Sequence, residues 1–244
     1  MSKICFIVGH GKSKSGGYDP GACANGAQEY KIAKEIAEYA QTYYNANFTE
    51  QADIMNENAD LYLSDRIKRV NAAGYDFVAE IHLNAGGGTG TECYYHKGSE
   101  IGRKYADEIS KEIAAALGVK QRSNGVDDGG DKVKLGSGGK DYFAIIRETA
   151  CTAVLIETVF IDSPADLAKV NTPDGQAACG AAIAEAVAKV RNAKRKTIVA
   201  PKPAKRVLHK IQGGAFADRK NAERRLAELK AAGWDDFFIV TVEE

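Results

Sequence analysis

Alternating apolar and amphipathic segments over roughly the first 190 residues most strongly limit the fold. Residues 3–8 and 153–161 are apolar almost throughout, and residues 76–82 carry the apolar residues Phe77, Val78 and Ile81, which is typical of strands that helices cover on both faces of a parallel sheet. Apolar residues recur with helical spacing over residues 29–44 and after Ser99, which indicates amphipathic helices. The pattern predicts an α/β fold with a mostly parallel central sheet flanked by helices.

The composition changes near residue 190, which marks a boundary in the chain. Residues 191–206 contain lysine, arginine and two prolines but no acidic residue, which is typical of a linker. Beyond it, residues 207–212 and 237–242 have strand character, and residues 221–232 have helix character. We therefore predict a main domain at 1–192, a basic linker at 193–206 and a small α+β module at 207–244.

Charge and hydropathy exclude several classes of protein. Lys+Arg and Asp+Glu both number 33, so the chain lacks the positive field of a nucleic-acid binder. No run approaches the roughly 18 apolar residues of a membrane span. The first apolar run ends at His10 and is too short for a signal peptide. We expect no nucleic-acid partner, no membrane insertion and synthesis in the cytoplasm without a signal peptide.

Four titratable residues stand where a ligand site is expected. His10 and His82 end two predicted strands, and ligands of open α/β sheets bind at the carboxyl ends of strands. Glu29 opens a helix, and Glu157 interrupts an apolar run, where an unpaired carboxylate is costly. Each also has a structural explanation: a strand-end histidine can simply be structural, a helix-start acid favours the helix dipole, and a buried glutamate can pair with lysine or arginine.

Two imidazoles and one carboxylate form a ligand set that zinc accepts while keeping a position for water. A second glutamate beside that water can take its proton. The candidate ligands lie far apart in the sequence, unlike the compact His-Glu-x-x-His motif, so the residues alone leave the zinc and structural explanations open.

The five cysteines are odd in number and form no Cys-x-x-Cys, which argues against a disulfide framework or a thiolate zinc site.

The segments around these residues form an ordered set of motifs. They are Val8-Gly9-His10-Gly11, Asp19-Pro20-Gly21-Ala22, Gly26-Ala27-Gln28-Glu29, Leu63-Ser64-Asp65-Arg66 with Asn71, Glu80-Ile81-His82-Leu83-Asn84-Ala85, and residues 154–161. Over roughly residues 3–190 the chain resembles the zinc-dependent N-acetylmuramoyl-L-alanine amidases, whose α/β fold is phosphorylase/hydrolase-like.

The resemblance implies a function and a role for each residue. Zinc would be bound by His10, Glu29 and His82, and Glu157 would be the catalytic glutamate. The substrate would be bacterial peptidoglycan, cut at the amide between N-acetylmuramic acid and L-alanine. The enzyme would act on the cell wall after synthesis in the bacterial cytoplasm, as a phage or prophage endolysin. The alternatives are a host cell-wall or sporulation amidase, a zinc peptidase acting on stem peptides, and a catalytically idle wall-binding protein.

The C-terminal module resembles half of a SPOR repeat, a type that binds glycan strands lacking stem peptides. The matching residues are Lys210-Ile211-Gln212-Gly213-Gly214-Ala215-Phe216, Asn221-Ala222-Glu223 and residues 226–233. A unit this short buries little surface by itself, and two strands leave open sheet edges. We therefore predict that residues 207–244 pair with the same segment of a second chain, which would make the protein a homodimer.

Overall fold

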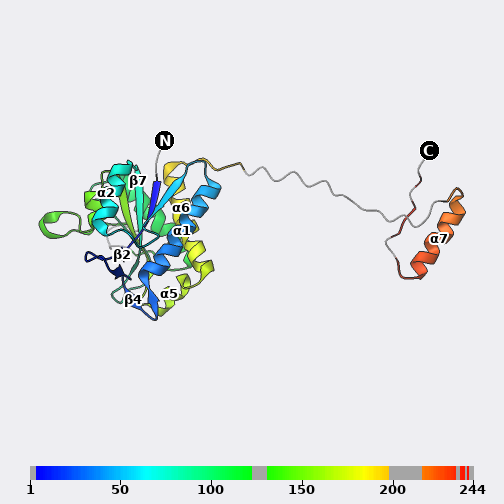
Figure 1. The fold of residues 1–244 in the computed structure, drawn as a ribbon, viewed down its shortest axis with the longest axis horizontal. Helices are drawn as coiled ribbons and strands as arrows, with labels where there is room; N and C mark the ends of the chain where they lie inside the picture. Colours follow the sequence, from blue (N-terminus) through cyan, green and yellow to red (C-terminus); the bar gives the residue numbers. More distant parts are fainter. Residues whose placement is uncertain (1–3, 123–130, 198–215, 235–236, 240, 242–244) are drawn as a thin grey trace. The chain divides into compact units, whose positions relative to one another are not determined.

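The chain divides into two compact units, Met1–Thr197 and Ile198–Glu244, in a computed structural model (Figure 1). The structure describes residues 4–122, 131–197, 216–234, 237–239 and 241. Each unit is described by itself below.

A six-stranded sheet forms the centre of the first unit. Its strands are β1 (Ile4–Val8), β6 (Ala52–Met55), β7 (Phe77–Asn84), β8 (Glu92–Tyr95), β9 (Asp131–Lys132) and β10 (Thr152–Phe160). Their order across the sheet is β6-β1-β7-β10-β8-β9. Every neighbouring pair is parallel except β10 and β8. The predicted mostly parallel central sheet is therefore confirmed.

Helices cover both faces of this sheet (Figure 1). Helices α1 (Glu29–Asn47), α3 (Glu100–Leu117) and α6 (Pro173–Arg191) bury one face in a single apolar cluster. Helices α2 (Leu63–Ala73) and α4 (Ala144–Glu148) cover the other face. Helix α5 (Pro164–Val170) packs against α6, and a short 3-10 turn, η1, spans Ser137–Gly139.

Local sequence signals set the ends of these helices. The Ser99 side chain accepts a hydrogen bond from the Gly102 backbone N–H and caps α3. Gly118 ends the same helix in the left-handed conformation, which glycine adopts without a steric penalty.

The segment between β1 and α1 contains more structure than its glycine and serine content predicts. It forms two short antiparallel pairs, β2 (Gly11–Lys12) with β3 (Tyr18–Asp19), and β4 (Cys23–Ala24) with β5 (Ala27–Gln28). The sequence predicted a loop here, because two-residue strands are too short to show an apolar period. These pairs fold the segment back so that Asp19 and Glu29 both lie beside the end of β1.

The second unit contains α7 (Arg219–Ala231), whose first turn is capped by the Asp218 side chain. This matches the helix expected at residues 221–232. The strand expected at 207–212 lies outside the described residues, and the described part of 237–242 is not in a strand. No helix in the described part of the chain is long and apolar enough to cross a bilayer.

Candidate metal centre

His10, Glu29 and His82 come together at the carboxyl ends of β1 and β7. One ligand atom from each residue lies within 4.8 Å of the others. Oε1 of Glu29 lies 3.2 Å from Nε2 of His10 and 2.9 Å from Nδ1 of His82. The three predicted ligands, far apart in the sequence, therefore form one cluster.

The backbone approaches the cluster so closely that Gly9 and Gly21 have no room for a side chain. A Cβ atom on Gly9 would lie 2.3 Å from the His82 ring, and one on Gly21 would lie 2.6 Å from a Glu29 oxygen. Glu29 is fixed by two backbone donors, since Ala22 N–H donates to its Oε2 and Leu83 N–H to its Oε1. The glycines of the predicted motifs thus allow close approach of the backbone to the cluster.

In each imidazole, the nitrogen that does not face Glu29 lies beside a second carboxylate. Nδ1 of His10 lies 3.0 Å from Oδ2 of Asp19, and Nε2 of His82 lies 3.3 Å from Oε2 of Glu80. Metal-binding histidines characteristically direct their second nitrogen to a carboxylate or carbonyl. Nε2 of His10 and Nδ1 of His82 are then left facing Glu29, so the donor set and its surroundings fit a zinc ion.

Sequence reasoning did not find Asp19 and Glu80. Glu80 lies two residues before His82 in β7, and side chains two apart in a strand share a face. The spacing of two residues could therefore have indicated that Glu80 lies beside His82. Asp19 had no comparable signal, because its contact with His10 depends on the short β2–β3 pair.

Glu157 lies on β10 in direct register with His82 on β7. Its Oε2 atom is buried and has no hydrogen-bond partner among the described residues. Burial raises the pKa of Glu157 to about 7, and the positive His82 ring opposes this rise only in part. A buried carboxyl with a free oxygen and a pKa near neutrality can accept and release protons.

The cluster shifts the pKa values of its own members. Burial alone would raise the pKa of Glu29, but the His10 and His82 rings outweigh burial and hold it well below its usual range. Burial alone would lower the pKa of His82, but Glu29 and Glu80 raise it to about 10. The pKa of His10 is also raised, since Glu29 and Asp19 outweigh its burial. The metal-free protein therefore keeps His82 protonated at neutral pH.

We predict that zinc binding releases protons from this site. A raised pKa keeps His82 charged at pH 7.5 in the metal-free protein, and zinc binds only the neutral imidazole. Titration calorimetry in buffers of different ionisation enthalpy should give an apparent binding enthalpy that changes linearly with the buffer. The slope should correspond to about one proton or more. An enthalpy independent of the buffer would contradict the prediction.

A further carboxylate, Glu92, lies in register with Glu157 on the neighbouring strand β8. Glu92 is buried and accepts hydrogen bonds from Asn84, Tyr94, Arg122 and Lys132. Unlike Glu157, it is fully engaged by donors, including two cations. These contacts lower the pKa of Glu92 although burial alone would raise it, whereas burial raises the pKa of Glu157.

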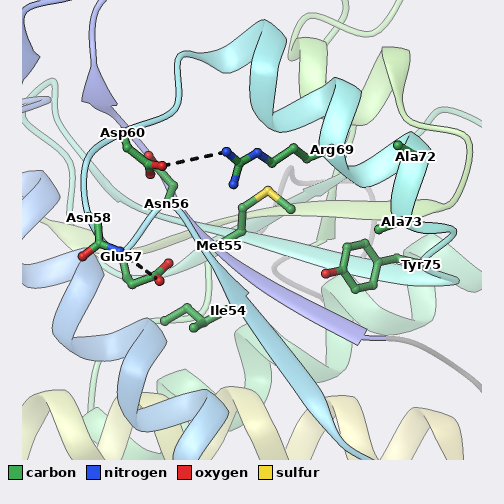
Figure 2. Close-up of a pocket in the computed structure, with 10 residues that line it drawn as sticks. All are labelled: Ile54, Met55, Asn56, Glu57, Asn58, Asp60, Arg69, Ala72, Ala73 and Tyr75. Carbon is green, nitrogen blue, oxygen red and sulfur yellow. Dashed lines mark hydrogen bonds and ion pairs between the residues drawn. The ribbon is translucent and has the colours of Figure 1, made fainter.

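A separate pocket of about 510 Å³ opens between the end of β6 and α2 (Figure 2). Arg69 and Asp60 face one another across it, and Tyr75 and Met55 line its other side (Figure 2). None of the four candidate residues lines this pocket. The candidate metal centre is therefore distinct from it.

Comparison with known proteins identifies the family. Residues 4–189 match the family model Amidase_3, described as N-acetylmuramoyl-L-alanine amidase. The sporulation-specific N-acetylmuramoyl-L-alanine amidase of Bacillus subtilis (strain 168) is 30% identical over 98% of this chain and 85% of its own length. The endolysin of Bacillus phage SPP1 is 28% identical over 81% of this chain and 69% of its own length.

A solved structure shows a similar fold. Cwp6 from Clostridium difficile superimposes with a TM-score of 0.67 at 28% identity, over 78% of this chain and 29% of that protein. The family match spans the sheet, its flanking helices and all four candidate residues. The chain therefore belongs to the N-acetylmuramoyl-L-alanine amidase family, hydrolases that act on peptidoglycan.

Proposed function

We propose that the chain is a zinc-dependent amidase in which His10, Glu29 and His82 bind the metal and Glu157 transfers protons. The observation that carries this proposal is the pairing of a three-ligand cluster with a buried carboxyl in register beside it. Zinc in such a site polarises a carbonyl and lowers the pKa of water. The fit of the donor set and of the two carboxylates behind the histidines supports zinc as the metal.

Glu157 is suited to both proton transfers of amide hydrolysis. In the first, its carboxylate takes a proton from the attacking water while the oxygen bonds to the carbonyl carbon. In the second, the same proton passes to the departing nitrogen as the C–N bond breaks. The products are the carboxylate of the lactyl group and the free amine of L-alanine. Glu29 would remain ionised throughout, because a carboxylate that binds a metal is deprotonated.

The second candidate activity is cleavage within the stem peptide by the same chemistry. Family membership favours the bond between N-acetylmuramic acid and L-alanine. Mass spectrometry of digested peptidoglycan separates the two activities. An amidase releases intact stem peptides with a free L-alanine amine and leaves glycan strands with unsubstituted lactyl groups. Truncated stem peptides still attached to glycan would overturn the proposal.

The biological setting has two candidates. The sequence predicted a phage or prophage endolysin, and similarity to a phage endolysin supports that role. Similarity to a sporulation-specific amidase runs through 98% of the chain, including the second unit, and supports wall cleavage by the sporulating cell. Protein levels after prophage induction and during sporulation distinguish them, since an endolysin rises only in the first case.

The second unit would bind glycan strands, as its likeness to half of a SPOR repeat implies. Its described aromatic side chains Trp234 and Phe238 are 61% and 69% exposed. Exposed aromatic rings of this kind could stack on sugar rings of the glycan. A test of this role measures binding of the full chain to purified glycan strands of peptidoglycan, with and without their stem peptides.

We predict that the second unit pairs two chains into a dimer. Two-fold pairing is the commonest arrangement of homo-oligomers. Light scattering should give a dimer for the full chain and a monomer for a chain truncated after Thr197. The truncation is placed there because the backbones of Lys194 and Lys196 hydrogen-bond to Thr49 and Asn47 within the first unit. A monomeric full chain at micromolar concentration would contradict the prediction.

A further inference from the structure

We propose that a buried ion pair, Arg66–Glu80, positions both histidines of the metal centre. Nε of Arg66 lies 2.9 Å from Oε1 of Glu80, and the two residues are only 4% and 2% exposed. Arg66 comes from α2 and Glu80 from β7. The inference rests on the proposed metal-binding function, and it assigns these two residues to positioning rather than to ligation.

Glu80 acts on the ring of His82. Its second oxygen lies 3.3 Å from Nε2 of His82, a buried nitrogen that has no hydrogen-bond partner among the described residues, so this contact is the ion-pair approach of a carboxylate to the ring. The contact turns Nδ1 of His82 toward Glu29, at 2.9 Å. The present orientation of the imidazole places Nε2 beside Glu80 and Nδ1 beside Glu29 at the same time. Rotation of the ring away from Glu80 would also move Nδ1 away from Glu29 and out of the cluster. Glu80 therefore selects the nitrogen that is presented to the metal.

Arg66 acts on the backbone of His10. Its Nη1 donates hydrogen bonds to the carbonyl oxygens of His10, at 2.9 Å, and of Leu61, at 3.1 Å. His10 has φ 60°, a left-handed conformation that costs free energy in a residue other than glycine. Nδ2 of Asn56 donates to the same carbonyl at 2.7 Å. Two donors thus hold His10 in a conformation that aims its ring at the cluster.

The burial of this pair argues for a role beyond stability. A buried ion pair is expensive to desolvate, and apolar residues of similar volume often stabilise a fold equally well. The surrounding cluster on this sheet face is apolar, so leucine would suit the same space. What leucine cannot supply is an acceptor for His82 and a donor for His10.

The test replaces the pair as a unit, with Arg66→Leu and Glu80→Leu together, which leaves no single buried charge behind. Zinc affinity, measured by competition with a chelator, should fall by about 10–100-fold, as for other residues that orient metal ligands. In the zinc-loaded protein the NMR signal of the His82 Nε2–H proton should move upfield, since its carboxylate acceptor is gone. A purely structural role would leave that signal and the affinity unchanged.

Two further variants serve as rescue and control. Glu80→Gln keeps an oxygen beside the ring N–H but removes the negative charge, so its zinc affinity should lie below that of the wild type and above that of the double variant. Glu50→Gln removes a carboxylate from another part-buried arginine, Arg191, and should leave zinc affinity unchanged. Melting of each metal-free protein reports folding.

Every result decides between the possibilities. If the wild type and the double variant bind zinc equally well, the positioning role is wrong while the metal site stands. If the wild type binds no zinc, the proposed function itself fails. If the double variant does not fold, Glu80→Gln decides alone, because unchanged affinity and an unchanged His82 proton signal would overturn the inference.

Discussion

Replacing His10, Glu29 or His82 with alanine is expected to abolish zinc binding and with it the hydrolysis of peptidoglycan. Each residue contributes one of the three ligand atoms that lie within 4.8 Å of one another, so its loss leaves two ligands of the three. Loss of the metal removes several kcal/mol of transition-state stabilisation. At about 1.4 kcal/mol for each factor of ten, the rate should fall by roughly 10³-fold or more.

Two measurements check this expectation. Atomic absorption should find zinc in the purified wild type and none in the three variants. Zinc should also raise the melting temperature of the wild type alone, because a ligand stabilises the folded state in proportion to its binding. His96→Ala is the matched control, since the His96 ring contacts Asp141 instead of the cluster. A variant that retained both zinc and activity would remove that residue from the ligand set.

The sequence predicted the central fold because the relevant signals are local. Buried parallel strands are continuous apolar runs, and Ser99 and Gly118 cap their helix as their residue types favour. Strand β6 was not predicted. It has only four residues, and one of them, Asp53, is exposed at the sheet edge, so neither an apolar run nor a long alternation marked it.

The sequence also predicted which ligands meet, for a physical reason. Strands of a parallel sheet end at the same edge, so His10 and His82 were expected at one edge, the resemblance implied the ligand set, and the pairing of β1 with β7 brings the two histidines together. The carboxylates behind them needed more information. The contact of Glu80 with Arg66 joins β7 to α2, and nothing in either segment alone indicates which buried cation balances which buried acid.

The structure decides whether Glu157 is paired with a lysine or an arginine. Its place in an apolar run left pairing with lysine or arginine as an ordinary explanation. Arg122 and Lys132 instead contact Glu92, one strand further along the sheet. Glu157 forms no ion pair among the described residues, and its Oε2 atom has no hydrogen-bond partner there. Strand order, which the sequence did not reveal, determines this difference.

Replacing Glu157 with glutamine is expected to keep zinc in the protein and remove most of its turnover. The amide has nearly the shape of the carboxylate but cannot accept a proton, and general acid–base catalysis contributes about 10²–10⁴-fold. The kcat should therefore fall by about that factor, while the zinc content measured by atomic absorption stays at the wild-type level. Zinc lost with Glu157 and retained without Glu29 would mean that the two glutamates have exchanged roles.

The pH dependence of kcat provides an independent check on Glu157. The carboxyl must be ionised to take a proton from water, and burial raises its pKa to about 7 in the metal-free protein. A bound cation favours the ionised form and lowers this value. The kcat of the zinc-loaded wild type should therefore decrease as the pH falls through a single ionisation below about 7. The residual kcat of Glu157→Gln should lack this ionisation, since the titrating group is gone. If the variant shows the same decrease as the wild type, another group supplies the base.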